Sequence, residues 1–500
     1  MPDTGKTVSY WMGTSQALER PPLSGDARAD VCVIGAGIAG LSTAYELARA
    51  GRDVVVLEAK HPGAGETGRT TAHLANAMDD RFVELERVHG EAGARIAAES
   101  HGAAIDRIEA VAAEEGIACE FRRVDGWLFL AAGAEETLLD RELEAARRAG
   151  LEVERHGEAP LPFATGPALR FAGQGEVHPL RYLHGLVAAI ERLGGRIHGQ
   201  THALDVDEND DGCRIMLRGG GEVACSHAVL ATNSPARHYL TTAKMLPYRT
   251  FAIAARAPGG VPRGLYWDTG DPYHYIRLAG PSEAPVLIVG GADHQTGTSD
   301  DGDARLRGLE EWTRERFPGV GEVTERWSGQ VLEPADFMAF IGRAPGSERV
   351  ALCTGDSGQG ITHGVIAGML LRDLIVGRKN PWADLYAPSR VRARAAREYV
   401  HEGVSVGRHY LDWLLPGEVE REEDVTPGHG AVLRSGLKPV AVYRDPDGTL
   451  HRRTAVCTHM GCVVHWNSTE GSWDCPCHGS RFDPEGGVLN GPATRGLDPA

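Results

Sequence analysis

A turn rich in glycine near the start of the chain joins a strand, a helix and a second strand. Residues 30–34 and 53–57 form short apolar runs typical of strands buried on both faces, and residues 38–50 have a helical pattern. A helix between two buried strands of this kind predicts a parallel strand–helix–strand unit, which needs an α/β sheet around it.

The glycines of this turn, Gly35, Gly37 and Gly40, stand where a bound dinucleotide requires them. The first allows the tight turn, the second lets a pyrophosphate approach the backbone, and the third lets the helix pack closely on the strand. Glu58 ends the second strand and can bond both hydroxyls of an adenosine ribose. We therefore predict dinucleotide binding rather than a purely structural turn, without a choice between FAD and NAD.

Length and charge narrow the possible partners. The 500 residues suggest two to four domains at roughly 100–200 residues each. A formal net charge of −17 argues against nucleic acid as the main partner. The N-terminus has no apolar signal region, and the longest apolar stretch, 364–376, is interrupted by Arg372 and Asp373. We expect a cytoplasmic protein without a membrane span.

Four of the nine cysteines lie close together near the C-terminus, in CTHMGC (457–462) and CPCHGS (475–480). The candidate ligands are Cys457 and His459, then, after fifteen intervening residues, Cys475 and His478. Two thiolates on one iron and two imidazoles on the other distinguish Rieske 2Fe–2S centres from clusters bound only by cysteine. Zinc uses similar residue types at different usual spacings, and incidental cysteines are the remaining alternative.

Over residues 9–386 the chain resembles the D-amino-acid-oxidase-like family of FAD-dependent oxidoreductases. The resemblance rests on the motifs VCVIGAGIAGLSTAYELA, VVVLEAK, GAGETGRTTAHL, HAVLATN, WSGQVLEPADFMAFIG and CTGDSGQGITHGVIAG. It implies FAD as the cofactor. It also implies an α/β (α+β) fold, in which a Rossmann-like FAD domain is interleaved with a sheet-based substrate domain.

With the C-terminal motif, these observations predict four regions. We expect an N-terminal arm (1–28), an oxidoreductase region (29–386), a linker (387–428) and an all-β Rieske domain (429–500). Within the oxidoreductase region, the FAD domain is expected at about 29–80, 165–240 and 340–386, and the substrate domain at about 81–164 and 241–339.

The family resemblance also implies further cofactor-binding residues. Arg69, Thr70 and Thr71 are expected beside the flavin and its phosphates. Backbone amides near the flavin pyrimidine edge are expected from Gly355, Asp356, Gly358, Gln359, Gly360 and Ile361. His73 lies near the position where some amine dehydrogenases of the family attach flavin covalently, and packing beside the cofactor is the alternative role.

The C-terminal segment resembles the Rieske proteins of cytochrome bc-type complexes. This resemblance implies a disulfide between Cys462 and Cys477, a cluster-covering loop at 491–493, and a hydroxyl of Ser480 that donates to a bridging sulfide. Phe482 stands where those proteins carry a tyrosine that donates to a cysteine sulfur. Because a phenyl ring cannot donate, we expect a reduction potential below the upper end of the ~−150 to +300 mV range.

Together the motifs predict a dehydrogenase that oxidises a C–N bond of an amine or amino-acid-like substrate by hydride transfer to FAD. The 2Fe–2S cluster is expected to pass electrons singly to a soluble acceptor. Strand alternation in DPYHYIRL puts Tyr273, Tyr275 and Arg277 on one face, where Arg277 is a candidate for binding a substrate carboxylate. The alternative is an exposed sheet face. His294 and Trp327 are weaker candidates.

Three other functions remain open to different degrees. A Rieske oxygenase needs a mononuclear iron site, and Glu176, His178 and His184 do not have its spacing. An electron-transfer flavoprotein reduced by NAD(P)H or a partner is the main rival, weakened by the single dinucleotide motif. A redox sensor is the third, and the sequence shows no DNA-binding or partner-helix signature for it.

Overall fold

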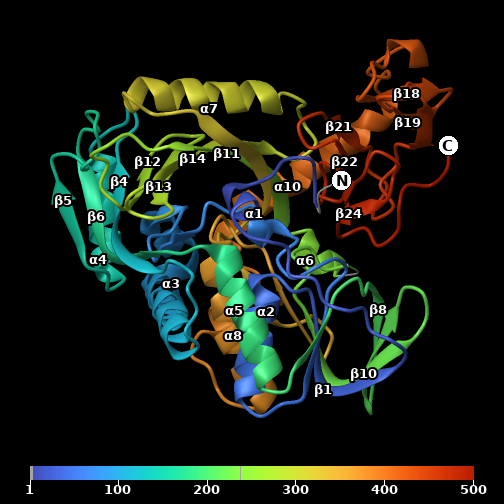
Figure 1. Cartoon of the computed structure of the whole chain (residues 1–500), viewed down its shortest axis with the longest axis horizontal. Helices are drawn as coiled ribbons and strands as arrows, with labels where there is room; N and C mark the ends of the chain where they lie inside the picture. The colour runs from blue at the N-terminus through green and yellow to red at the C-terminus, as the bar shows by residue number, and fades with distance from the viewer. Residues whose placement is uncertain (1–3, 237) are drawn as a thin grey trace.

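Two large sheets and two small ones organise the described residues, 4–236 and 238–500, of this computed structural model (Figure 1). The first large sheet has the order β16-β17-β10-β1-β2-β7, extended by β8 and β9. Its strands are β1 (Ala27–Ile34), β2 (Val54–Leu57), β7 (Arg196–His198), β8 (Ala203–Asn209), β9 (Gly212–Leu217), β10 (Glu222–Leu230), β16 (Phe340–Arg343) and β17 (Val350–Thr354). The parallel pairing of β1 with β2 and β10 confirms the predicted α/β unit.

The second large sheet has the order β15-β11-β14-β13-β12-β4-β6-β3, with β5 paired to β6. Its strands are β3 (His73–Leu74), β4 (Arg122–Phe129), β5 (Val153–His156), β6 (Ala168–Glu176), β11 (Met245–Arg256), β12 (Leu265–Asp268), β13 (His274–Ala279), β14 (Val286–Gln295) and β15 (Val323–Pro334). β3 and β6 thus belong to the second sheet, whereas the expected boundaries placed them in the FAD domain. β6 pairs with both β3 and β4 and so joins segments far apart in sequence, which the local pattern does not show.

Helices pack against both large sheets. They are α1 (Tyr10–Gly13), α2 (Ile38–Arg49), α3 (Arg81–Glu114), α4 (Thr137–Arg148), α5 (Pro179–Arg192), α6 (Tyr239–Thr242), α7 (Gly302–Arg316), α8 (Gly360–Val376), α9 (Ala383–Tyr386) and α10 (Ala396–His409). α2 packs against α5 and α8, and α7 crosses β11 and β14 (Figure 1). A Cβ at Gly368 of α8 would lie 2.9 Å from the backbone of Ser42, so glycine permits this close packing.

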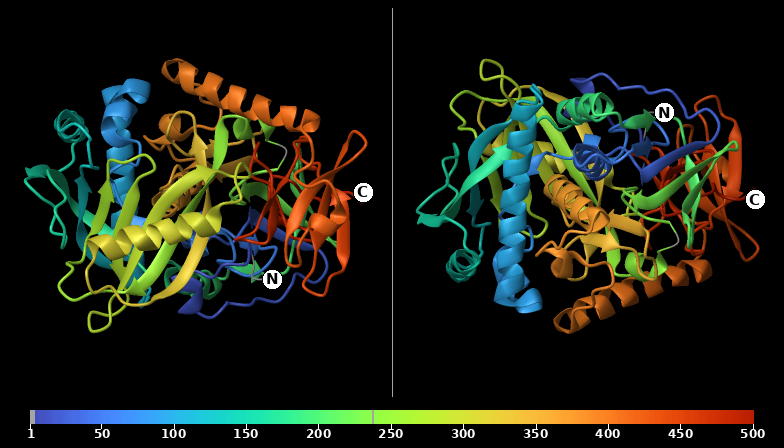
Figure 2. Two further views of the ribbon diagram at one scale, coloured as in Figure 1. Left: turned by 90° about the horizontal axis from the view of Figure 1, so that it is seen from above. Right: turned by 90° about the horizontal axis from the view of Figure 1, so that it is seen from below.

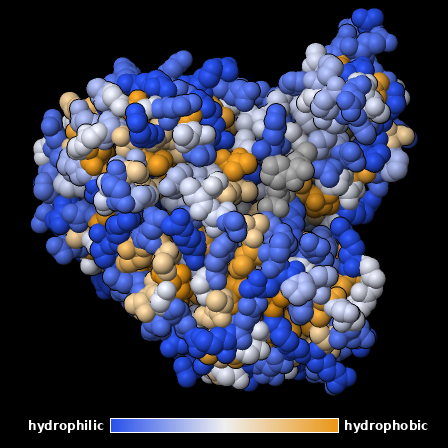
Figure 3. Space-filling model, in the orientation of Figure 1, coloured by the Kyte–Doolittle hydropathy of each residue, from blue (hydrophilic) through white to orange (hydrophobic). Residues whose placement is uncertain are grey.

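The C-terminal unit is built from short antiparallel strands, as expected. The three-stranded sheet contains β18 (Gly430–Ser435), β19 (Lys438–Arg444) and β20 (Leu450–Thr454). The four-stranded sheet contains β21 (His465–Asn467), β22 (Ser472–Asp474), β23 (Arg481–Phe482) and β24 (Val488–Asn490). This unit projects from one corner of a largely hydrophilic face (Figure 3).

Two segments expected to be simple connections are folded. The linker region 387–428 contains α10, which lies along the outside of the molecule (Figure 2). In the N-terminal arm, Trp11 is buried and its indole N–H donates to the carbonyl oxygen of Thr70 at 2.6 Å. Both segments are polar in composition. Because their buried contacts are with residues distant in sequence, the local sequence does not predict them.

None of the helices formed by the described residues combines the length and apolar character that a membrane span requires.

Candidate functional site

The glycine turn between β1 and α2 has the geometry that the sequence predicts. Gly35 has a φ of 106°, and a Cβ there would lie 2.3 Å from the carbonyl oxygen of Ala231. A Cβ at Gly40 would lie 1.9 Å from the carbonyl oxygen of Gly35. Neither position has room for a side chain. Gly37 caps the N-terminus of α2 and lines the adjoining cavity, where a phosphate would meet the helix end.

Glu58 follows β2, and a backbone N–H donates to each of its two carboxylate oxygens. Its Oε2 accepts from the N–H of Ala36 at 2.8 Å, and its Oε1 accepts from the N–H of Lys60 at 3.0 Å. Burial raises the pKa of Glu58, and the two backbone donors oppose this shift. Each oxygen keeps a lone pair for a ribose hydroxyl, so the carboxylate fits its predicted role.

One cavity of about 1090 Å³ brings most of the predicted residues together. The predicted residues that line it are Gly35, Gly37, Glu58, Arg69, Thr70, Thr71, Tyr273, Tyr275, Gly355, Asp356, Gly358, Gln359, Gly360 and Ile361. Gly40 lies behind the turn, as its packing role requires. The cavity therefore runs from the dinucleotide turn to the face of the nine-stranded sheet, and this lining fits a bound FAD.

Arg69 lines the cavity, but its guanidinium is committed elsewhere. It donates to Thr4 Oγ1 at 2.7 Å, to the carbonyl oxygen of Ser328 at 2.9 Å, and to Glu470 Oε1 at 3.2 Å. Glu470 belongs to the C-terminal unit. The position of Arg69 beside the flavin stays a prediction. The structure adds that its charge is neutralised by a carboxylate about 400 residues away, which local sequence does not reveal.

Arg277 does not reach the cavity with the two tyrosines. Its guanidinium is buried, donates to the carbonyl oxygens of Ala72 and Thr71, and lies 5.3 Å from the centre of the Trp11 ring. Burial lowers its pKa to about 10. Alternation does place Arg277 on the same face as Tyr275, but further along β13, where β3 and α1 cover that face. The predicted carboxylate-binding role does not fit this position.

Tyr273 and Tyr275 do face the cavity, with ring centres 5.3 Å apart. The hydroxyl of Tyr273 donates to Asp79 Oδ2 at 2.9 Å, and that of Tyr275 is bonded to the hydroxyl of Thr250. His73 also lines the cavity.

Both ring nitrogens of His73 have partners: Nδ1 lies 3.2 Å from Thr71 Oγ1, and Nε2 lies 3.3 Å from the carbonyl oxygen of Ile276. These contacts favour packing over covalent attachment. Of the weaker candidates, Trp327 lines the cavity and donates to the carbonyl oxygen of Arg69, while His294 stacks on Phe251.

Sequence reasoning missed a group of carboxylates in this cavity. Asp79, Asp80, Asp293 and Glu333 all line it. Four residues separate the pair at 79–80 from the end of the GRTTAHL motif, and this closeness was an available signal. Asp293 and Glu333 are brought there only by the pairing of β14 and β15 with β11.

In the C-terminal unit, the four predicted ligands lie together. Cys457 and Cys475 are buried free thiols in hydrogen-bond contact with each other. The rings of His459 and His478 are 5.0 Å apart, and each has one buried nitrogen without a partner among the described residues. Burial lowers the pKa of both imidazoles to about 4, so they are neutral near pH 7. Paired thiols and neutral imidazoles fit a Rieske cluster.

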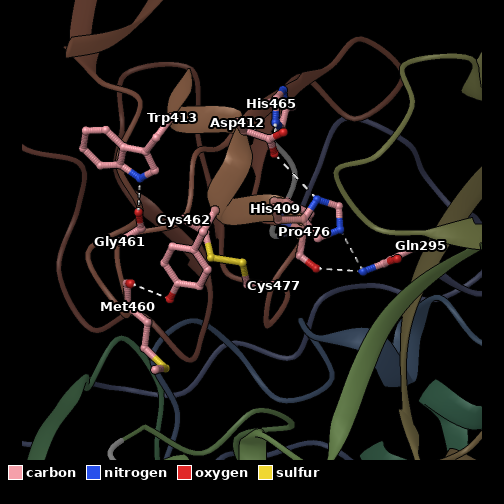
Figure 4. Close-up of a disulfide and its surroundings, with 11 residues drawn as sticks. Gln295, His409, Asp412, Trp413, Met460, Gly461, Cys462, His465, Pro476 and Cys477 are labelled. Atoms are coloured by element: carbon pink, nitrogen blue, oxygen red, sulfur yellow. Dashed lines mark hydrogen bonds and ion pairs between the residues drawn. A yellow bond between two sulfur atoms is a disulfide. The ribbon is translucent and has the colours of Figure 1, made fainter. Parts of the chain in front are cut away.

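The cysteines next to these ligands form the expected disulfide, between Cys462 and Cys477 (Figure 4). The sulfurs of Cys462, Cys475 and Cys477 lie within 4.8 Å of one another. Because two of them are bonded to each other, only Cys475 of this group is available as a thiolate. The hydroxyl of Ser480 accepts from the N–H of Ala493 at 3.1 Å and contacts Cys457.

The loops that carry the candidate cluster ligands contact residues that line the cavity. Gln330 of β15 lines the cavity, and its amide nitrogen donates to the carbonyl oxygen of Gly479 at 3.0 Å. Gly479 follows His478 in the chain. The ring of Tyr239 stacks on His459 with centres 5.2 Å apart. Residues 491–493, the expected cluster-covering loop, also line the cavity.

A second contact lies beside the disulfide. Gln295 of β14 touches His409 and donates to the carbonyl oxygen of Pro476 at 3.2 Å (Figure 4). The C-terminal unit is therefore docked against the wall of the cavity from β14 as well as β15.

A dinucleotide-binding turn that opens into a sheet-walled cavity, joined to a domain with paired thiols and imidazoles, defines a flavoenzyme with a Rieske domain. The chain belongs to the FAD dependent oxidoreductase family (DAO), whose model matches residues 30–374, and a Rieske [2Fe-2S] domain matches residues 416–499. Its cofactors are FAD and a Rieske-type 2Fe–2S cluster.

Similar proteins share either the whole architecture or the oxidoreductase region. The Rieske 2Fe-2S iron-sulfur protein YhfW of Bacillus subtilis (strain 168) is 31% identical over 98% of this chain and 96% of its own. Gamma-glutamylputrescine oxidoreductase of Escherichia coli (strain K12) is 26% identical over 75% of this chain and 90% of its own.

Among solved structures, glycine oxidase from Geobacillus kaustophilus matches with a TM-score of 0.60 and 18% identity over 73% of this chain and 100% of its own. L-proline dehydrogenase from P. horikoshii matches with a TM-score of 0.60 and 17% identity over 73% of this chain and 98% of its own. At these identities the two structures establish a shared fold.

Proposed function

We propose that this enzyme is a dehydrogenase that oxidises a C–N bond of an amine or amino-acid-like substrate and passes the electrons through its Rieske domain to a soluble acceptor. Bound FAD would accept electrons in pairs and the cluster would carry them singly. The relatives named as acting on glycine, proline and gamma-glutamylputrescine support this substrate class.

The observation that carries the proposal is the hydrogen bond from Gln330 to Gly479. Gln330 lines the cavity, and Gly479 adjoins the ligand candidate His478, so one side chain connects the two sites. A docked arrangement of this kind makes electron transfer within one molecule possible without movement of the linker.

The chain's own residues would hold the two groups as follows. Gly35, Gly37 and Glu58 would bind the dinucleotide, and the loop 355–361 would approach the flavin ring. Cys457, His459, Cys475 and His478 would hold the cluster. Tyr273 and Tyr275 would form the wall against which the substrate lies.

Anaerobic reduction of the purified holoenzyme tests this proposal. We expect a panel of amines and amino acids to bleach the flavin absorbance, followed by the appearance of the electron paramagnetic resonance signal of a reduced Rieske cluster. A protein that NADH reduces readily, and that no amine or amino acid reduces, would instead be an electron-transfer flavoprotein. FAD and iron content, measured independently, exclude incomplete loading.

The residue at position 482 provides a second test. Phe482 is fully buried on β23, and Phe482→Tyr is expected to raise the reduction potential, because a new hydroxyl donor stabilises the reduced, electron-rich cluster. A hydrogen bond worth about 1–2 kcal/mol corresponds to roughly 40–90 mV for one electron. A redox titration measures the shift, with Phe482→Leu as the control that adds no donor. A wild-type potential near +300 mV would contradict the premise.

A further inference from the structure

The part of the cavity lined by the second sheet contains carboxylates, which accept hydrogen bonds, and aromatic rings. Tyr273, Tyr275 and Trp267 supply rings, and Asp79 and Asp293 supply carboxylates. Asp79 accepts from Tyr273, which places one carboxylate beside this aromatic pair. Rings combined with carboxylates are the groups that proteins use to bind ammonium ions.

Asp293 lies near the end of β14, two positions beyond the point where β14 pairs with His274 of β13. Its Oδ1 atom is buried and has no hydrogen-bond partner among the described residues. A buried carboxylate oxygen without a donor is unfavourable unless a ligand supplies one.

A second buried acceptor lines the same cavity, on the loop expected beside the flavin. Gln359 lines the cavity and is only 7% exposed. Its amide nitrogen donates to the carbonyl oxygen of Ala77 at 2.7 Å, which fixes the orientation of the amide. The amide oxygen is therefore a buried acceptor, and no described residue donates to it. Gln359 therefore requires a donor from bound FAD, whereas Asp293, on β14, requires one from another ligand.

Among the described residues, the strands of the second sheet offer this cavity no cationic side chain that could bind a substrate carboxylate. Within the part of the chain that the structure describes, β11–β14 contribute no cationic side chain to the cavity. Arg277 is outside the cavity lining and donates to the carbonyl oxygen of Ala72, and Arg69 is paired with Glu470. Other cationic residues also line the cavity, but they come from segments outside β11–β14: Lys60, Arg81, Arg218 and Arg397.

The electrostatics agree with this geometry. Burial raises the pKa of Asp79 to about 6, despite the hydrogen bond from Tyr273. Burial also raises the pKa of Asp293 to about 7, although Arg305 acts in the opposite direction. For each carboxyl, burial outweighs the groups that favour its ionised form, and a bound ammonium would add a further such group.

We infer that this wall binds the remote ammonium group of an aliphatic diamine or polyamine, and that the enzyme selects such cations over α-amino acids. The inference rests on the proposed function and specifies its substrate class. Asp293 and Asp79 would hold the remote ammonium while the other amine lies against the flavin side of the cavity.

Calorimetric titration of the anaerobic holoenzyme tests the inference with three probes: 1,4-diaminobutane, 1-aminobutane and N-methylglycine. We expect the diamine to bind at least tenfold more tightly than the other two. Asp293→Asn is expected to weaken diamine binding at least tenfold and to leave 1-aminobutane binding unchanged. Glu144→Gln, on an exposed side chain of α4, is the matched control and should change neither.

Flavin content and the circular dichroism spectrum check that Asp293→Asn folds, and Asp79→Asn is the second variant if it does not. Tighter binding and flavin bleaching by N-methylglycine than by the diamine would overturn the inference while supporting the proposed function. Unchanged diamine binding in both variants would also overturn it. Failure of all three probes to bind or to bleach the flavin, with reduction by NADH, would overturn both proposals.

Discussion

Cys457→Ser is expected to separate the two half-reactions of this enzyme. Loss of one thiolate ligand should remove the cluster, because Cys457 is a buried candidate ligand with no other thiol besides Cys475 available at the site. Flavin bleaching by substrate should persist, since the FAD-binding residues lie on other segments. Transfer to a one-electron acceptor should fall more than ~100-fold.

The measurements for this variant are iron content, the paramagnetic resonance signal and single-turnover kinetics. Cys119→Ser is the matched control, because Cys119 is also a buried free cysteine but lies in the main hydrophobic core. A Cys457→Ser protein that kept its iron and its resonance signal would contradict the ligand assignment.

Glu470→Gln is expected to loosen the docking of the Rieske domain. The carboxylate of Glu470 is fully buried at the domain interface, where it accepts from Arg69 and Ser328 and lies 3.9 Å from Arg249. Removing the negative charge takes away the carboxylate partner of the buried Arg69 and leaves Asp474, at 3.7 Å, as the carboxylate partner of Arg249. Breaking a buried ion pair in this way costs about 3–5 kcal/mol.

The same residue gives the interface a predictable pH dependence. Burial alone would raise the pKa of Glu470, but Arg69, Arg249 and Arg481 outweigh burial and lower it to about 2. Because the folded-state pKa is below the unfolded value of ~4.3, the stabilisation is complete above that value and is lost as the pH falls toward 2. The shift corresponds to about 3 kcal/mol.

Hydrogen exchange across residues 387–428 and denaturant unfolding at several pH values measure both effects. Wild-type protein should lose interface protection between about pH 4 and 2, and Glu470→Gln should show weak protection at all pH values. Glu315→Gln, whose side chain is 76% exposed, is the control. Equal protection in wild type and Glu470→Gln would show that the ion pairs do not stabilise the interface.

The parts of the site that could be predicted depend on local sequence. The turn at Gly35 and Gly40 is dictated by steric contacts within one strand–helix unit, and the Cys-x-His and Cys-x-x-His spacings lie within single loops. Such features are visible in the chain because the residues that act together are close in sequence.

The parts that could not be predicted depend on contacts between distant segments. Alternation assigned Arg277 to the correct face of β13, but only the three-dimensional structure shows that Trp11 and residues 71–72 cover it. The carboxylate of Asp293 reaches the cavity through the pairing of β14 with β11 and β13. Likewise, nothing near Arg69 indicates that its partner is Glu470.

The contacts of the N-terminal arm have a consequence for the order of folding. Arg481 donates to the carbonyl oxygen of Thr4, and the N–H of Lys6 donates to that of Glu470 at 2.9 Å. Synthesis of 500 residues takes roughly 25–100 s. Thr4 and Lys6 lack these two partners for most of that interval, because Arg481 is translated 477 residues after Thr4. The contacts of the arm with residues 68–70 can therefore form early, whereas its contacts with the Rieske domain can form only after that domain has been translated.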